Sequence, residues 1–476
     1  MKNVHDWKKV HLIGIGGINM SAVAKILLKA GIKVSGSDVK ETDITKEAAA
    51  LGVAVAIGPQ NAANIPVDCD GVIHTSAAPD SNPERVEAKN RNLPDTDNFK
   101  WMGEWFKSKK VVLVTGTHGK STTTALLGQM AIAGGLDPTV IVGSRVPGWA
   151  DHNLRFGQSG LVIIEGDEYA RHFLEFHPEA LIINNIELDH VDIYKNIDEV
   201  RKTFEKLLRQ VKINGTVIAN GEYDQILTAV KPLSATKKLN VQYFARQNKV
   251  VPELRTPDSV HVVVIAWKDD KLHVSIKSAK SDLKLTSSLI GDYNGMNIAA
   301  AALMAKHLGV ADSAIAEAAG DFPGIWRRME LIDEVKGVPV FSDYGHHPSA
   351  VTNVISAVRE AYPDKRIVLC FQPHHKNRTK NLWQEFVACF DRADVLVLCE
   401  IYDVAGRAAP EDANITSQKL LDEVRARAVA RPLDITEYAP DPESAVKRTL
   451  NIIKEGDICI FMGAGDIDSA LRDRMK

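Results

Sequence analysis

The sequence is poor in cysteine and has no C-x-x-C pair and no long apolar segment. Its 476 residues include five cysteines, most of them in apolar stretches, so we expect reduced core residues of a cytoplasmic protein. No apolar stretch reaches the length of a membrane span. The first residues also lack the apolar core of a signal peptide, so we expect no membrane partner.

The charge pattern is balanced and contains no basic run. The net charge is −3, which argues against a nucleic-acid-binding surface. Hydrophobic residues make up 45% and charged residues 25%, as in an ordinary globular protein. The length predicts two to four domains, and we expect a monomer or homodimer.

The most informative stretch is VVLVTGTHGKSTTTALLGQM, at residues 111–130. Val111–Val114 is typical of a strand buried on both faces, and apolar residues recur at helical spacing after Thr122. The turn between them ends in Gly-Lys-Ser, so its backbone N–H groups favour an anion. Lys120 can reach the outer phosphates of a nucleotide, and the Ser121 hydroxyl can bind Mg²⁺.

This stretch departs from the general phosphate-loop pattern at Val114, where a glycine is expected. The simpler alternative is an ordinary strand-to-helix turn with a surface lysine. We predict a nucleotide site formed by Gly116, Thr117, His118, Gly119, Lys120, Ser121 and Thr122.

Residues 1–107 are predicted to form a first, Rossmann-like domain. A strand is followed by the glycines Gly14, Gly16 and Gly17. Asn19 takes the place of the third fingerprint glycine, while Asp38 stands where a ribose-binding acid belongs. These glycines could bind a dinucleotide, or another nucleotide or diphosphate. Alternatively, they form a turn that is packed for structural reasons only. A further strand, residues 71–77, ends in a loop that should face the same crevice.

Residues 108–323 are predicted to form a central domain in which three strands end in polar residues. Because the carboxyl ends of parallel strands share one edge, Ser121, Glu165 and His190 are expected to converge there. Glu165 supplies the oxygen that Mg²⁺ prefers, whereas His190 suits a metal or a structural hydrogen bond. Spacing does not rank the neighbouring acids, which are Asp167, Glu168 and Asp189.

The later part of this domain changes character. Within residues 240–290, the stretches VHVVVIAW and LHVSIKS alternate polar and apolar residues on either side of residues 268–271 and predict an antiparallel hairpin. Asn294 and Asn297 precede an alanine-rich helix predicted at 298–307, where they suit helix caps or contacts to an adenine base.

Residues 324–476 repeat the strand–loop–helix pattern four times. The loops that follow these strands hold Asp, His, Arg and Gly, which favours a ligand-binding edge. Arg327 and Arg328 lie near the start of this region and suit either a site or the solvated surface.

The chain resembles the Mur ligase family along its whole length. The stretches that carry the resemblance occur in the family's order: GIGGINMS, SAAPDSNPE, GTHGKSTTT, EGDEYARHFL, NIELDHVDIY, GDYNGMN, WRRME, DYGHHP, FQPHHKNRT, IYDVAGR and MGAGDI. The resemblance implies an α/β fold of three domains. These are a Rossmann-like domain that binds a UDP-sugar, a central P-loop ATPase domain with a mostly parallel sheet and a small antiparallel sheet, and a C-terminal Rossmann-like domain.

The resemblance also implies roles for individual residues. Lys120 binds the β- and γ-phosphates of ATP, while Ser121, Glu165 and His190 bind Mg²⁺. Asn294, Asn297 and Arg327 contact the nucleotide, and His346 and Arg378 join Lys120 as catalytic residues. The expected contacts to the UDP-sugar and the amino acid are Gly14, Gly16, Gly17, Ser37, Asp38, Ser76, Asp343, Tyr344 and His374.

The implied reaction joins L-alanine to the carboxylate of UDP-N-acetylmuramate through an acyl phosphate, releasing ADP and phosphate. It serves peptidoglycan precursor synthesis, with ATP and Mg²⁺ as cofactors. GDEY at 166–169 also resembles family members that recycle a tripeptide onto the same sugar acid. Two other hypotheses are an NAD-dependent oxidoreductase, based on the first glycines and Asp38, and a non-catalytic nucleotide-binding module.

Overall fold

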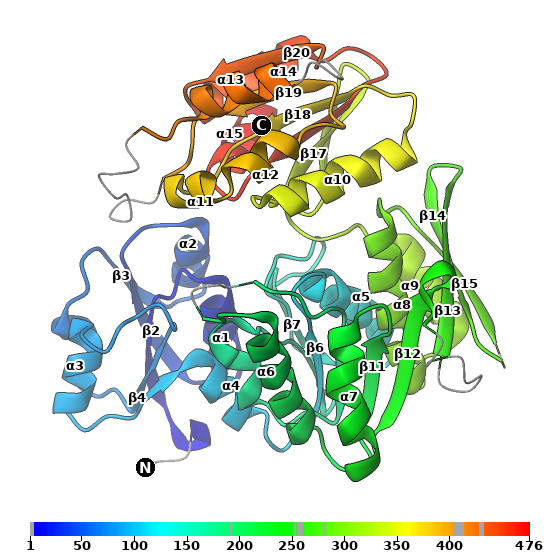
Figure 1. Cartoon of the computed structure of the whole chain (residues 1–476). Helices are drawn as coiled ribbons and strands as arrows, with labels where there is room; N and C mark the ends of the chain where they lie inside the picture. The colour runs from blue at the N-terminus through cyan, green and yellow to red at the C-terminus, as the bar shows by residue number, and fades with distance from the viewer. Residues whose placement is uncertain are drawn as a thin grey trace. The chain divides into compact units, whose positions relative to one another are not determined.

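The computed structural model describes residues 4–189, 193–251, 254, 260–279, 281–403, 414–427 and 433–476. It divides into two compact units. The first comprises residues up to 265 with 273–287 and 295–322, and the second comprises 266–272, 288–294 and 323–476. The described ranges contain three sheets, of five, ten and six strands, flanked by helices (Figure 1). This confirms the predicted α/β class.

The first sheet is parallel throughout, with strand order β3-β2-β1-β4-β5. Its elements are η1 (Val4–Asp6), β1 (Lys9–Ile13), α1 (Ile18–Lys29), β2 (Lys33–Asp38), α2 (Asp43–Ala50), β3 (Ala54–Ile57), η2 (Ala62–Asn64), β4 (Gly71–His74), α3 (Pro83–Asn90), β5 (Asp95–Asp97) and α4 (Asn98–Trp105). The central position of β1 brings the glycine turn after it between the ends of β2 and β4. The predicted Rossmann-like order is therefore confirmed.

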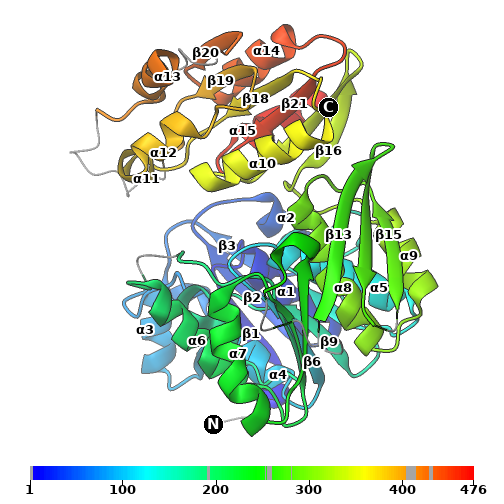
Figure 2. The same ribbon diagram turned by 45° about the vertical axis from the view of Figure 1, so that its right-hand side comes forward.

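The second sheet has the order β15-β14-β13-β12-β11-β10-β6-β9-β7-β8. Its strands are β6 (Lys110–Thr115), β7 (Thr139–Ile141), β8 (Leu154–Arg155), β9 (Leu161–Glu165), β10 (Ala180–Ile183), β11 (Thr216–Asn220), β12 (Asn240–Arg246), β13 (Val260–Lys268), β14 (Lys271–Lys277) and β15 (Asp282–Ser287). Its helices are α5 (Lys120–Ala133), η3 (Tyr169–Glu175), α6 (Ile197–Gln210), α7 (Asp224–Thr236), η4 (Gln247–Lys249), α8 (Asp292–His307) and α9 (Asp312–Asp321). Figure 2 shows α8 and α9 beside the β13–β15 end of the sheet.

Three neighbouring strands of this sheet place the predicted site. Strand β6 pairs in parallel with β10 on one side and with β9 on the other. Their carboxyl ends therefore share one edge, as predicted. Only Asp269 and Asp270 connect β13 to β14, and both have positive φ (53° and 54°), so these neighbours form a tight antiparallel hairpin.

The third sheet has the order β16-β17-β21-β18-β19-β20, with β16 antiparallel to β17 and the other pairs parallel. Its strands are β16 (Glu330–Val335), β17 (Val338–Asp343), β18 (Ile367–Phe371), β19 (Val395–Cys399), β20 (Ile435–Ala439) and β21 (Ile458–Met462). Its helices are α10 (Pro348–Ala361), α11 (Lys376–Asn381), α12 (Trp383–Ala388), α13 (Ser417–Arg427), α14 (Pro442–Ile452) and α15 (Ile467–Met475).

Both faces of the third sheet are buried, because alternate residues of β18 enter different hydrophobic clusters. Leu369 packs with Phe386 and Leu420 on one face, while Cys370 packs with Val446 and Leu471 on the other. This explains why its strands are continuous apolar runs in the sequence.

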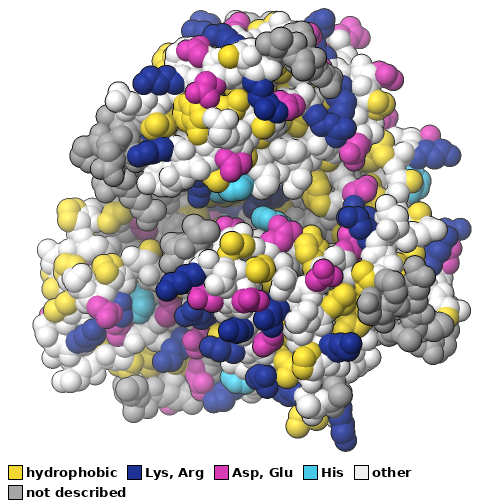
Figure 3. Space-filling view, viewed as in Figure 1, with side chains coloured by type: hydrophobic (Ala, Val, Ile, Leu, Met, Phe, Trp, Pro, Cys, Tyr) yellow, Lys and Arg dark blue, Asp and Glu magenta, His cyan; other side chains and the backbone are white. Residues whose placement is uncertain are grey.

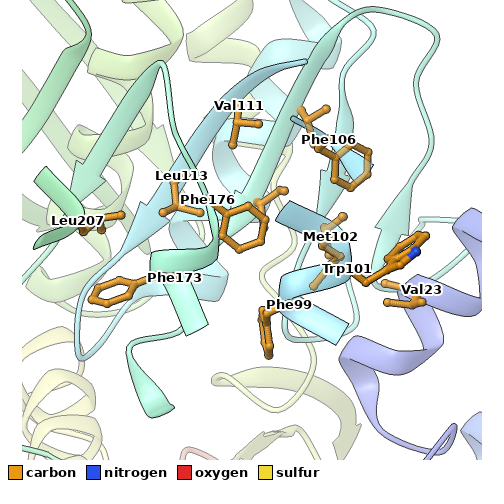
Figure 4. Close-up of a cluster of buried hydrophobic side chains, with 14 of the residues drawn as sticks. Val23, Phe99, Trp101, Met102, Phe106, Val111, Leu113, Phe173, Phe176 and Leu207 are labelled. Atoms are coloured by element: carbon orange, nitrogen blue, oxygen red, sulfur yellow. The ribbon is translucent and has the colours of Figure 1, made fainter. Parts of the chain in front are cut away.

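One hydrophobic cluster joins the first two sheets within the first unit. Trp101 and Met102 of α4, Val23 of α1, Leu113 of β6 and Phe173 of η3 are all fully buried in it (Figure 4). Because the cluster is continuous, the first and central domains pack against each other through apolar side chains as well as polar contacts.

The described helices also correct one prediction. Helix α8 begins at Asp292, six residues before the predicted start, so Asn294 and Asn297 lie inside the helix and are not its caps. Gly291, with φ +97°, forms the turn that lets the helix begin early.

The surface carries both signs of charge. Figure 3 shows cationic and anionic side chains interspersed over the visible face, in keeping with the net charge of −3. None of the helices in the described ranges has both the length and the apolar character needed to cross a membrane.

Candidate functional site

The turn between β6 and α5 has the geometry of an anion-binding loop. Gly119 adopts the left-handed conformation (φ +79°) directly before α5 and provides no side-chain cap. The first N–H groups of the helix therefore face the turn without a side-chain acceptor at the cap position, the arrangement in which helix N-termini bind phosphate. A helix beginning at Lys120 confirms the predicted strand–turn–helix unit.

Lys120 is folded back over this loop. Its Nζ atom lies 2.9 Å from the Gly116 carbonyl oxygen, 3.3 Å from that of Thr117 and 2.8 Å from Glu168 Oε2. Burial lowers the pKa of Lys120, but the charge of Glu168, followed by Asp167, outweighs this and the net pKa is raised. Lys120 therefore carries a full positive charge at the mouth of the loop.

Ser121 and Glu165 form the part of the predicted metal site that lies in the described residues. Ser121 Oγ donates to Glu165 Oε1 at 2.8 Å, and the Gly143 N–H donates to Glu165 Oε2 at 2.6 Å. Burial raises the pKa of Glu165 above its usual value, although the charge of Lys120 opposes this. A nearby cation stabilises the charged form of a carboxylate that is buried away from water.

This oxygen pair fits magnesium. Mg²⁺ binds oxygen at about 2.0–2.1 Å in octahedral geometry, so two adjacent ligands lie about 2.9 Å apart. The 2.8 Å between Ser121 Oγ and Glu165 Oε1 matches that spacing. Within the described ranges, no group of three or more His, Cys, Asp or Glu side chains is arranged to hold a metal. The third predicted ligand, His190, lies outside the described residues.

Asparagines from the end of β10 and from α8 complete the phosphate loop. Asn185 Oδ1 accepts the His118 N–H at 2.7 Å, and Asn184 donates to Thr123 Oγ1 at 2.9 Å. A Cβ atom on Gly119 would meet Asn297 Oδ1, so Asn297 lies against the loop. Asn294 donates its amide to the Ile290 carbonyl at 2.9 Å.

Sequence reasoning left Glu168 unranked and missed Asn184 and Asn185. The asparagine pair directly follows a buried strand, which is the signal that points to the sheet edge. Spacing could not distinguish Glu168 from the neighbouring acids. Its contact with Lys120 depends on the conformation of the chain after Glu165. The other predicted loop residues, Thr117 and Thr122, are both buried there.

The glycine turn of the first domain has a different electrostatic character. Gly14 adopts φ +78°, and the Gly16 N–H donates to Asp38 Oδ2 at 2.9 Å. Gly17 is the N-cap of α1 and has no side-chain cap. Asp38 therefore holds the turn itself. Ser37, also predicted to bind substrate, is buried and donates to Glu84 at 2.6 Å.

Ser76 follows β4 on the same edge and is exposed. Its Oγ donates to Asp97 Oδ2 at 2.6 Å and lies 2.7 Å from His172 Nε2, in the segment that follows β9. A predicted substrate residue of the first domain thus contacts the central domain within one compact unit.

In the third domain, the strand ends gather the predicted residues. Asp343 at the end of β17 accepts the N–H groups of Met329 and Gly345 at 2.9 and 2.7 Å, and burial raises its pKa. Arg327 is buried in the same domain, where it donates to the Gly463 carbonyl and lies over the ring of Tyr344 at 5.0 Å.

Two histidines on neighbouring loops of this edge are kept neutral. Burial, and then the charge of Arg378, lower the pKa of His346 to about 4. Burial, followed by His375, lowers the pKa of His374 to about 3. The ring centroids of His346 and His374 lie 5.7 Å apart, and the His374 ring stacks on Tyr402 at 5.3 Å. The edge therefore offers imidazole groups that accept hydrogen bonds at neutral pH.

These features define a phosphate-loop class of nucleotide-binding α/β protein. Comparison with family models matches the Mur ligase family catalytic domain at residues 9–110, the Mur ligase middle domain at 114–305 and the Mur ligase glutamate ligase domain at 327–465. The chain belongs to the Mur ligase family. Members are ATP-dependent enzymes that form amide bonds, so the chain is a ligase of this kind.

Individual relatives cover nearly the whole chain. The UDP-N-acetylmuramate–L-alanine ligase of Geobacter sulfurreducens is 34% identical over 97% of this chain and 95% of its own. The enzyme of the same name from Aquifex aeolicus is 32% identical, with 98% and 97% covered. Among solved structures, the UDP-N-acetylmuramate-alanine ligase MurC of Thermotoga maritima has a TM-score of 0.79 at 27% identity, with 98% of both chains covered.

A peptide ligase shares the fold. The murein peptide ligase Mpl of Psychrobacter arcticus has a TM-score of 0.66 at 22% identity, covering 98% of this chain and 99% of its own. At that identity the likeness shows the fold alone.

Proposed function

We propose that this protein joins L-alanine to the carboxylate of UDP-N-acetylmuramate, using ATP and Mg²⁺, as a cytoplasmic step of peptidoglycan precursor synthesis. The observation that carries the proposal is Lys120 at a phosphate loop beside the Ser121–Glu165 oxygen pair. Relatives that are 32–35% identical over nearly the full chain and are named for this reaction support the choice of substrates.

The first step of the proposed reaction is phosphoryl transfer. A carboxylate oxygen of the sugar acid attacks the γ-phosphorus of ATP, and the bond from that phosphorus to ADP breaks, leaving an acyl phosphate. Lys120 and the N–H groups at the start of α5 stabilise the negative charge on the transferred group. Ser121 and Glu165, with His190 as the predicted third ligand, would hold Mg²⁺. When bound, this ion supplies positive charge to the phosphates.

The second step is amide formation. The amine nitrogen of L-alanine attacks the acyl carbon, the bond from that carbon to the phosphate oxygen breaks, and phosphate leaves. The amine must lose a proton, and His346 is the proposed acceptor because it is neutral at pH 7. Asp343, Tyr344, His374 and Arg378 are proposed to orient the amino acid, while Arg327 and Asn294 remain predicted contacts to ATP.

The first domain is proposed to hold the UDP part of the substrate. Gly14, Gly16 and Gly17 form the turn directly before α1, and their own N–H groups donate within it to Ser37 O, Asp38 Oδ2 and Gly14 O. The proposed donors to the diphosphate are therefore the first N–H groups of α1, and Ser76 is exposed on the same edge. Because Asp38 already accepts the Gly16 N–H, its proposed role is to shape the turn.

The test is phosphate release from Mg-ATP with UDP-N-acetylmuramate, comparing L-alanine with the tripeptide acceptor. We expect release that depends on both the sugar acid and L-alanine, with the amide product detected by mass. Lys120→Ala should abolish release, while Lys109→Ala, at an exposed lysine just before β6, should not.

Three results would contradict the proposal. Release only with the tripeptide assigns the protein to peptide recycling. Binding of ATP without any substrate-dependent release indicates a non-catalytic module. Binding of NAD, with hydride transfer and without release, restores the oxidoreductase hypothesis.

A further inference from the structure

The segment from Glu165 to His172 contacts the phosphate loop at its beginning. It runs from the last residue of β9 into η3. Within it, Glu165 accepts a hydrogen bond from the Ser121 hydroxyl at 2.8 Å, and Glu168 accepts one from Lys120 Nζ at 2.8 Å. The position of this segment therefore determines where the two residues proposed to meet ATP and Mg²⁺ are held.

The other end of the same segment contacts the first domain. His172 is 9% exposed, its ring stacks on Phe99 with centroids 4.2 Å apart and planes 12° apart, and its Nε2 lies 2.7 Å from Ser76 Oγ. Ser76 has a single hydroxyl hydrogen, which it gives to Asp97 at 2.6 Å. His172 Nε2 therefore carries a proton and donates to Ser76.

On the far side of Ser76, the contacts continue to the glycine turn. The Thr75 N–H donates to the Ile13 carbonyl at 3.0 Å, and a Cβ atom on Gly14 would meet the Thr75 side chain. His172 thus touches a loop that packs directly against the proposed diphosphate-binding turn. All of these residues belong to the first compact unit.

The backbone between the two ends is strained. Ala170 and Arg171 are consecutive non-glycine residues with φ of 48° and 64°. Such conformations are unfavourable for residues with a side chain and persist only where the surroundings enforce them. Here Glu168 O accepts both the Tyr194 hydroxyl at 2.7 Å and the Arg171 N–H at 3.0 Å. These two bonds hold the Glu168 backbone in the middle of the segment, between its contacts with the two domains.

We propose that His172 is a positioning residue that couples the UDP-sugar site to the ATP site through the segment Glu165–His172. A UDP-sugar that orders the Ser76 loop would fix His172, and through the strained backbone it would fix Glu168, Lys120 and Glu165 for phosphate binding. This inference rests on the proposed function, since it requires that both ligands bind.

The experiment measures binding of the non-hydrolysable ATP analogue AMP-PNP, with Mg²⁺, by calorimetry in the absence and presence of saturating UDP-N-acetylmuramate. For the wild type we expect the sugar to tighten analogue binding at least about fivefold, the lower end of usual allosteric coupling. His172→Phe retains an aromatic ring to stack on Phe99 but cannot donate to Ser76. We expect its coupling ratio to fall below about twofold, while each ligand alone binds within about threefold of the wild type.

Two further variants separate positioning from folding. His172→Gln retains an N–H donor near the position of Nε2 and should recover most of the coupling. His177→Phe changes an exposed histidine five residues further along and should leave the coupling ratio unchanged. Should His172→Phe fail to fold in a melting control, His172→Asn, whose amide is too short to reach Ser76, takes its place.

The outcomes are distinguishable. A wild-type ratio of one, or an unchanged ratio in the His172 variants, overturns the coupling role even if the enzyme turns over L-alanine. Failure of the wild type to bind UDP-N-acetylmuramate at all overturns the proposed function, and the coupling with it.

Discussion

The strand–glycine turn–helix units of the first and central domains look alike in sequence but differ in charge. In the central domain, Lys120 folds over the turn between β6 and α5 and is the cation that an incoming phosphate meets. In the first domain, the turn between β1 and α1 has the Asp38 carboxylate on its Gly16 N–H. The same backbone motif thus presents a cation in one place and an anion in the other.

This difference in charge indicates that the two turns have different functions. A lysine close to a helix N-terminus stabilises charge that develops during phosphoryl transfer. A turn whose N–H is already held by a carboxylate suits the binding of a group that does not react. The backbone motif alone therefore indicates a phosphate-binding site. The side chains around it determine whether the bound phosphate takes part in phosphoryl transfer.

The largest expected effect comes from removing the cation. Lys120→Ala should reduce kcat for phosphate release by about a thousandfold or more, as expected for loss of a main charge-stabilising group. It also leaves Glu168, only 2% exposed, without its lysine, which should cost about 3–5 kcal/mol of stability. Steady-state kinetics and thermal melting measure the two effects.

A double variant separates them. Lys120→Ala combined with Glu168→Gln also removes the buried carboxylate charge that has lost its lysine, so the melting temperature should recover while turnover stays lost. Recovery of turnover together with stability would show that Lys120 has only a structural role.

The two turns can be compared through matched glycines. Gly14, Gly31 and Gly119 all adopt φ between +77° and +79°, but a Cβ atom would clash only at Gly14 and Gly119. We expect Gly119→Ala to raise KM for ATP roughly tenfold or more and Gly14→Ala to raise KM for the UDP-sugar similarly, because each changes the shape of one turn. Gly31→Ala should cost only about 1–2 kcal/mol of stability and leave both KM values unchanged. Equal effects of Gly14→Ala on both substrates would contradict the division of roles.

The third domain extends the comparison, because two imidazoles at its edge, those of His346 and His374, are neutral at pH 7. His346 and His374 have pKa values of about 4 and about 3, below the usual histidine pKa of 6.5. Between pH 4 and 6.5 the unfolded chain therefore binds more protons than the folded one, so stability rises with pH in this window. His346→Asn should flatten the rise by about 1 kcal/mol, after allowance for the partial exposure of this histidine. Melting temperatures at several pH values measure this, and an unchanged slope would contradict the assigned pKa.

The smallest expected effect concerns the anion of the first turn. Asp38→Asn keeps an oxygen that accepts the Gly16 N–H but removes a negative charge close to the proposed diphosphate. We expect UDP-sugar binding to tighten two- to fivefold, roughly 0.4–1 kcal/mol, with no change for ATP. Calorimetry decides, and weaker binding would mean that Asp38 contacts the substrate directly.

The sequence predicted what depends on local pattern. Buried apolar runs located β6, β9 and β10 to within a few residues, and in the third domain they located β17, β18, β19 and β21 but not β16 or β20. The glycine turn marked the start of α5. The approach of Ser121 to Glu165 followed from the rule that parallel strand ends share an edge.

What depends on contacts between distant segments was beyond sequence reasoning. In the sequence, Glu168 cannot be told apart from the neighbouring acids. In the structure, it contacts Lys120 just before the strained backbone at Ala170. Helix α8 starts early because of the turn at Gly291. The role of Asp38 in shaping its own turn is likewise a matter of tertiary geometry and not of spacing.

The position of β21 has a consequence for how the third domain is made. This strand follows the other five in the chain, yet it lies between β17 and β18 in the middle of the sheet. During synthesis on the ribosome, β17 and β18 therefore emerge before the strand that pairs with both of them. They cannot complete their hydrogen bonding until residues 458–462 have left the exit tunnel. The domain must acquire its fold late and over long sequence separations, which makes it the part of the nascent chain most in need of protection from aggregation.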